Sequence, residues 1–216
     1  GFYFTYPEQL DVKSKAWLRH YFEEHIYPVV TPLAVDSGHP FPFLTNHTIN
    51  AIVRIFQIQP DGTKDYKIAI LPIPSVLDRI IEIPSRGNKE HRFVYLEDVI
   101  TYYANQFFQG YGIEDYMVFR ITRDADLEID EEEATDLLSE VEASLRRRRR
   151  GDAVRLEVCG EVKDDLLDFV LTSVELEPKD VYRIDGHLDC RMYFNFCNYP
   201  GLDQLRYVPF EPKLPS

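Results

Sequence analysis

The stretch INAIVRIFQIQPDGTKDYKIAIL, from Ile49 to Leu71, decides the fold of this chain. It holds two runs rich in β-branched and aromatic residues, Ile49–Ile58 and Tyr66–Leu71, and the residues between them include Pro60-Asp61-Gly62-Thr63. Glycine takes a positive φ in such a turn without steric cost, so we expect the two runs to pair as a hairpin. The sequence therefore predicts at least one antiparallel pair of strands.

A helix is predicted on the N-terminal side of this hairpin. The segment from Pro7 to His25 has apolar residues at helical spacing and charged residues on its other face, which is typical of an amphipathic helix. The residues expected to face inward are Leu10, Trp17, Leu18, Tyr21 and Phe22. Pro28 is expected to end this helix because proline has no backbone N–H. The next segment, Tyr27–Asn50, carries four prolines and is expected to be extended and irregular.

Strands and helices are predicted to alternate on the C-terminal side. Short strands are expected at Arg79–Ile83, Arg92–Tyr95, Met117–Ile121, Val154–Val158 and Val181–Ile184. Helices are expected at Leu96–Phe107, Asp130–Arg149 and Lys163–Leu171. This order predicts an α/β (α+β) layered sandwich with a mixed sheet, preceded by the N-terminal amphipathic helix. The proline-rich end, residues 207–216, is expected to be a linker.

The composition argues against several classes of function. The formal net charge is −13, from 24 Lys and Arg against 37 Asp and Glu, whereas nucleic-acid-binding proteins present a basic surface. No apolar run approaches the roughly 18–20 residues of a membrane span, so direct membrane insertion is not expected. The three cysteines, Cys159, Cys190 and Cys197, have no metal-binding spacing and are expected to be buried free thiols in the cytoplasm.

Two clusters of arginines are candidates for contact with an anion: Arg120 with Arg123, and Arg146–Arg148 within a run of five arginines. A dense positive cluster can replace the counterions of a phosphate chain. The run at 146–150, however, ends a helix that begins with acidic residues, which is the charge order that complements the helix dipole. Arg120 and Arg123 lie close to Asp124 and Asp126, so an ion-pair network is favoured over a phosphate or Mg²⁺ site.

No catalytic residue can be named in this chain. The six histidines lack the spacing of a known metal site, so no metal ligand and no cofactor are expected. The glycine-rich and nucleophile motifs GxxxxGK[ST], GxGxxG and GxSxG are absent from the sequence. A free-standing enzyme is therefore disfavoured.

Three long strings of sequence resemble one family. TPLAVDSGHPFPFLTNHTIN (Thr31–Asn50), FRITRDADLEIDEEEATDLL (Phe119–Leu138) and RRRRRGDAVRLEV (Arg146–Val158) are similar to the head, or middle, domain of the histidine-phosphorylating bacterial polyphosphate kinases. The ends WLRHYFEEHIYPVVTP and DGHLDCRMYFNFCNYP also resemble that domain. The resemblance covers nearly the whole chain.

The resemblance implies a parent enzyme that reversibly transfers the terminal phosphate of ATP to polyphosphate through a phosphohistidine, with Mg²⁺. It also implies that the catalytic histidines lie in C-terminal domains absent from this chain, and that an N-terminal domain precedes it. Residues 1–206 would be the head domain, divided into the helix (1–26), a hairpin-containing part (27–116) and a βαβαβ-like part (117–206). Residues 207–216 would lead to a catalytic domain.

The same resemblance implies a role in subunit contact for this domain. We expect a homodimer, with the aromatic strings packing against a second subunit or the missing domains, because aromatic residues are enriched in interface cores. The candidate interface residues are His39, Phe41, Phe43, Tyr193, Phe194 and Phe196. The alternative is a domain that binds ATP or polyphosphate directly through a basic stripe of arginines. Any membrane association would come through the parent.

Overall fold

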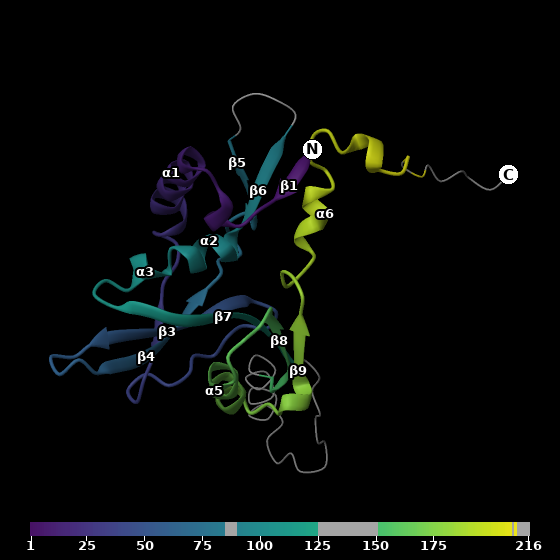
Figure 1. Cartoon of the computed structure of the whole chain (residues 1–216). Helices are drawn as coiled ribbons and strands as arrows, with labels where there is room; N and C mark the ends of the chain where they lie inside the picture. Colours follow the sequence, from purple (N-terminus) through teal and green to yellow (C-terminus); the bar gives the residue numbers. More distant parts are fainter. Residues whose placement is uncertain (85–89, 125–150, 209, 211–216) are drawn as a thin grey trace, which may run out of the picture.

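The computed structural model describes residues 1–84, 90–124, 151–208 and 210, and they form two β-sheets with helices packed around them (Figure 1). A six-stranded sheet has the order β2-β4-β3-β7-β8-β9, and a three-stranded sheet has the order β1-β6-β5. The strands of the larger sheet are β2 (Leu33–Val35), β3 (Ile49–Ile58), β4 (Lys64–Pro72), β7 (Gly112–Arg123), β8 (Ala153–Cys159) and β9 (Val181–Ile184). Those of the smaller sheet are β1 (Phe2–Phe4), β5 (Ile80–Ile83) and β6 (His91–Tyr95).

Both sheets contain parallel and antiparallel neighbours. In the smaller sheet, β1 is parallel to β6 and β5 is antiparallel to β6. Among the described strands of the larger sheet, β8 and β9 are the only parallel neighbours. The predicted hairpin is confirmed: β3 and β4 pair from Asn50 opposite Pro72 to Ile58 opposite Lys64, and Gly62 in the connecting turn has a φ of 84°.

The larger sheet separates two hydrophobic cores. Since successive side chains of a strand point to opposite faces, Ala51 and Val53 of β3 face one core and Ile52 faces the other. The first core is covered by helices and the smaller sheet, and the second by α5 (Figure 1). This layered arrangement of helices and mixed sheets confirms the predicted fold class.

The helices differ in detail from the prediction. They are α1 (Val12–Tyr21), α2 (Leu96–Tyr102), α3 (Ala104–Phe107), α5 (Asp164–Val174) and α6 (Met192–Phe196). The first begins at Val12 because the side chain of Asp11 accepts hydrogen bonds from the N–H groups of Lys13 and Ser14, and it runs on into a π-turn at Phe22–Ile26.

Several elements were not predicted correctly. The helix expected over Leu96–Phe107 is interrupted at Tyr103, whose φ and ψ are −99° and 17° and whose ring stacks on that of Phe22 at 4.7 Å. Strands β1 and β2 and helix α6 are too short to show a hydrophobic period in the sequence. The helix expected over Asp130–Arg149 lies outside the described residues. No helix among the described residues is both long and apolar enough to span a membrane.

Candidate functional site: a charge-balanced pocket beside α6

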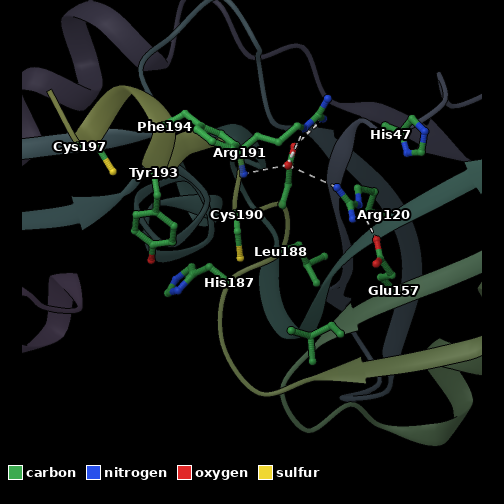
Figure 2. A pocket seen from close by; sticks show the side chains of 12 residues that line it. His47, Arg120, Glu157, His187, Leu188, Cys190, Arg191, Tyr193, Phe194 and Cys197 are labelled. Atoms are coloured by element: carbon green, nitrogen blue, oxygen red, sulfur yellow. Dashed lines mark hydrogen bonds and ion pairs between the residues drawn. The ribbon is translucent and has the colours of Figure 1, made fainter. Parts of the chain in front are cut away.

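A pocket of about 730 Å³ opens between the larger sheet and the segment that connects β9 to α6 (Figure 2). We call it the Arg120 pocket. Its walls include residues of β7 and β8, residues of the β9–α6 connection, and residues of α6 itself. Among them are Arg120, Glu157, His187, Asp189, Arg191 and Phe194.

Positive and negative side chains alternate along one wall of this pocket. Arg120 of β7 stands opposite Glu157 of β8 in the sheet, and its Nε donates to the buried Glu157 carboxylate. The Nη1 atom of Arg120 also lies 3.5 Å from an oxygen of Asp189. On its other side Asp189 accepts two hydrogen bonds from the Arg191 guanidinium, at 2.7 and 2.6 Å. The hydrogen bonds from Arg191 hold the pKa of Asp189 below its ordinary value.

The two arginines and two carboxylates of this wall balance one another in charge. Glu157 has a further partner, since Arg155 Nη2 lies 2.9 Å from its second oxygen, but Arg155 does not line the pocket. An unpaired buried carboxylate would be very costly, and this chain of contacts leaves neither Glu157 nor Asp189 unpaired. Arg120 therefore belongs to an ion-pair network, but the partners that the structure gives it are Glu157 of β8 and Asp189 of the β9–α6 connection. Of the partners predicted from the sequence, Asp126 lies outside the described residues.

The backbone at two positions of the pocket has an uncommon conformation. Asp189 has a φ of 58° and His47 a φ of 61°, and non-glycine residues adopt such values infrequently. The backbone around Asp189 is held in place by Arg79, whose guanidinium donates to the carbonyl oxygens of Leu188 at 2.8 Å and Asp189 at 2.9 Å. Residues kept in this region tend to occur at functional sites.

Arg123, the second candidate anion contact, serves a different part of the molecule. Its guanidinium donates to the carbonyl oxygens of Leu44 and Gly151, both at 3.0 Å, and lies 4.2 Å from the centre of the Phe43 ring. Burial lowers the pKa of Arg123. The structure therefore does not bring Arg123 to the pocket that Arg120 lines. Arg146, Arg147 and Arg148 lie outside the described residues.

The six candidate interface residues divide into two groups. Tyr193, Phe41 and Phe196 make contacts inside the chain: the Tyr193 hydroxyl bonds that of Tyr95, the ring of Phe41 lies 6.3 Å from that of Phe169, and the ring of Phe196 lies 5.1 Å from that of Phe93. His39, Phe43 and Phe194 are exposed, Phe194 at 77%, although Phe43 also contacts Arg123 and His39 also contacts Asp36.

The cysteines are free, but the expectation that all three are buried is wrong. Cys190, just before α6, and Cys197, just after it, are exposed and line the Arg120 pocket. Cys159 at the end of β8 is only partly exposed, and its Sγ lies 2.9 Å from the carbonyl oxygen of Gly186. Burial raises the pKa of the Cys159 thiol to about 11.

Sequence reasoning missed several residues of the site. The sequence pattern of β8 predicted a strand but gave no role to Glu157, whose side chain is buried against Arg120. Sequence reasoning also gave no role to His187, whose Nε2 lies 2.8 Å from an Asp98 oxygen and whose ring stacks on Tyr95 at 3.6 Å. The signal for this site in the sequence was short local pairs of opposite charge, such as Asp189 and Arg191. No group of three or more metal-binding side chains occurs in the part of the chain that the structure describes.

Comparison with known proteins assigns the chain to a family. The family model described as the polyphosphate kinase middle domain matches residues 13–196. The polyphosphate kinase of Halalkalibacterium halodurans is 40% identical over 219 residues, which cover 99% of this chain and 31% of that protein. The polyphosphate kinase of Pseudomonas putida is 36% identical over 205 residues, covering 94% of this chain and 28% of that protein.

One solved structure has the same fold. The crystal structure of polyphosphate kinase from Porphyromonas gingivalis matches with a TM-score of 0.76 and 23% identity, over 99% of this chain and 30% of that chain. The chain thus spans about 30% of the length of the relatives it matches. From the family model and these relatives, the chain belongs to the polyphosphate kinase middle-domain family.

Proposed function

We propose that this chain is the non-catalytic middle domain of a longer polyphosphate kinase, where it supports dimerisation and packing between domains. In the parent enzyme, ATP, Mg²⁺, polyphosphate and the phosphorylated histidine would be handled by parts of the polypeptide outside this chain. The curated relatives are more than three times as long as the segment they share with it, which leaves room for such parts.

The observation that carries this proposal is a run of exposed apolar side chains near the C-terminal end. Leu205, Tyr207, Val208 and Phe210 are all exposed, Tyr207 at 99%. A cluster of large apolar residues in contact with water commonly marks a surface that another protein segment covers. Figure 1 shows this end extending away from the two sheets, where it can reach a neighbouring domain.

The contacts of the arginines weigh against the alternative, direct binding of ATP or polyphosphate through a basic stripe. Arg120 is paired with Glu157 and Asp189, and Arg123 donates to backbone carbonyls. A phosphate chain would have to displace these partners before either guanidinium became available to it.

The test is a variant of the full kinase with Leu205→Ser and Tyr207→Ser. Because both side chains are exposed, we expect the thermal stability of the middle domain itself to be unchanged. We expect hydrogen exchange at residues 200–208 to become faster in the variant kinase, since the covering segment is lost. Unchanged exchange in the variant would contradict the proposal.

A further inference from the structure

We propose that the Arg120 pocket is the docking site for a large apolar or aromatic side chain carried by the kinase polypeptide outside this chain. The inference rests on the proposed function, because it requires that such polypeptide exists and packs against this domain. It adds a specific pocket and a specific kind of anchor to that function.

The chemistry of the lining suits a protein side chain better than an anion. The guanidiniums of Arg120 and Arg191 are already paired with Glu157 and Asp189, so neither is available to an anion without losing a carboxylate partner. The rest of the lining is mainly apolar, with Ile184, Leu188 and Phe194 among its residues. Paired arginines beside aromatic residues are a common composition for the core of an interface.

The size and rigidity of the pocket also fit this role. A volume of about 730 Å³ lies within the roughly 300–1,000 Å³ of sites that bury a compact ligand, so one large side chain and its flanking backbone can enter. Figure 2 shows Tyr193 and Cys190 on one side of the pocket and Arg120 and Glu157 on the other.

Three contacts hold in place the side of the pocket that carries Tyr193 and Cys190. Arg79 fixes the backbone at Leu188 and Asp189, the Tyr193 hydroxyl bonds that of Tyr95, and His187 pairs with Asp98. A wall that is already ordered loses little conformational entropy when a partner binds.

The rest of the same polypeptide is the occupant for two reasons. The relatives carry about 70% of their length outside the region shared with this chain, and a covalently linked segment competes at a high effective concentration. In addition, α6 supplies part of the pocket wall, and nine positions after its last residue begin the exposed apolar side chains Leu205, Tyr207, Val208 and Phe210. One segment of the remaining polypeptide could therefore cover both surfaces.

The experiment places p-benzoyl-phenylalanine at Phe194 in the full kinase and maps its photo-cross-links by mass spectrometry. The matched control carries the same residue at Tyr66, an exposed aromatic position of β4 that does not line the pocket. We expect a cross-link from position 194 to a peptide outside residues 1–216, and none to that peptide from position 66. A cross-link from position 194 only to residues 1–216, including those of a second copy, would overturn the proposal.

The two cysteines of the pocket provide an independent measurement. In the full kinase, we expect Cys190 and Cys197 to be alkylated about ten-fold more slowly than in the unfolded protein, and Phe194→Ala to restore most of the rate, as expected for loss of an anchor contact. Tyr66→Ala should leave the rate unchanged. Rapid alkylation of both thiols in the unmodified kinase would overturn the proposal.

Hydrogen exchange distinguishes failure of the pocket proposal from failure of the proposed function. If residues 200–208 are protected in the full kinase while both thiols react rapidly, the domain packs on its neighbours but the pocket is not the docking site. If neither is protected, both proposals are wrong.

Discussion

The guanidinium of Arg79 lies against the carboxylate of Glu97, which is only 2% exposed. Arg79 comes directly before β5 and Glu97 lies in the first turn of α2. The same guanidinium donates to the carbonyl oxygens of Leu188 and Asp189. This one side chain therefore ties the smaller sheet and α2 to the segment that forms the wall of the Arg120 pocket.

Replacing Arg79 should strongly destabilise the domain. Arg79→Met keeps much of the apolar stem but leaves the buried Glu97 carboxylate without its partner, at a cost of about 3 kcal/mol in the free energy of unfolding. Denaturation of the purified chain in urea would measure it. The control is Arg19→Met, which breaks an exposed pair with Glu23 and should leave the free energy of unfolding nearly unchanged. Equal effects of the two substitutions would contradict this role of Arg79.

The extent of successful prediction follows the length of each sequence pattern. Long apolar periods or clear turn residues mark the hairpin of β3 and β4, the strand β9 and the helices α1 and α5. The ends of these elements were predicted within a few residues. Strand β1 has three residues and exists because β6 offers it a neighbour. No local pattern reports such a pairing between distant segments.

The site was less predictable than the fold, for a related reason. Arg120 was recognised as a candidate, but its partners Glu157 and Asp189 are 37 and 69 residues further along the chain, and only the folded sheet brings them together. No sequence pattern gave Glu157 a role, because a strand pattern does not show which residue stands opposite it in the neighbouring strand, here Arg120. The resemblance to the kinase family came from long unusual strings rather than from any catalytic motif.

Removal of the Asp189 charge should give a destabilisation that depends on pH. Asp189→Asn preserves the positive φ, which asparagine tolerates, but weakens the contacts with Arg120 and Arg191. We expect a loss of about 1–2 kcal/mol at pH 7. Because the folded pKa of Asp189 lies below its ordinary value of 3.8, its contribution is present above about pH 4 and is lost as the pH falls through the folded pKa. Urea denaturation should show a smaller difference in free energy of unfolding between the unmodified protein and Asp189→Asn at pH 3 than at pH 7. The same difference at both pH values would contradict this role of Asp189.

The three thiols should differ in reactivity. At pH 8, iodoacetamide should modify the exposed Cys190 and Cys197 of the purified chain, while Cys159, with its pKa raised to about 11 by burial, should react only slowly. The contribution of the protonated Cys159 to stability is complete below its ordinary pKa of 9.0 and is lost as the pH rises through about 11. Mass spectrometry of alkylated peptides over time measures the rates, and similar rates at all three positions would contradict this assignment.

Two phenylalanines of α6 provide a matched comparison. Phe196 packs on Phe2, Phe93 and Tyr199, so Phe196→Ala should cost about 2 kcal/mol in the free energy of unfolding. Phe194→Ala removes an exposed ring and should change that free energy by less than about 0.5 kcal/mol, while weakening association with the rest of the kinase. Urea denaturation measures the free energy of unfolding of each variant. The association of this domain with the rest of the kinase polypeptide is measured in the full kinase. Unaltered partner binding in both Phe194→Ala and Phe41→Ala would contradict the predicted interface.

The central claim, that this domain serves assembly rather than binding of polyphosphate, is tested most directly by light scattering coupled to size exclusion, with and without polyphosphate at about 50 and 200 mM salt. We expect a particle of twice the 25.4 kDa of one chain that polyphosphate does not change at either salt concentration. A particle of 25.4 kDa that binds polyphosphate, more weakly at the higher salt concentration, would contradict it.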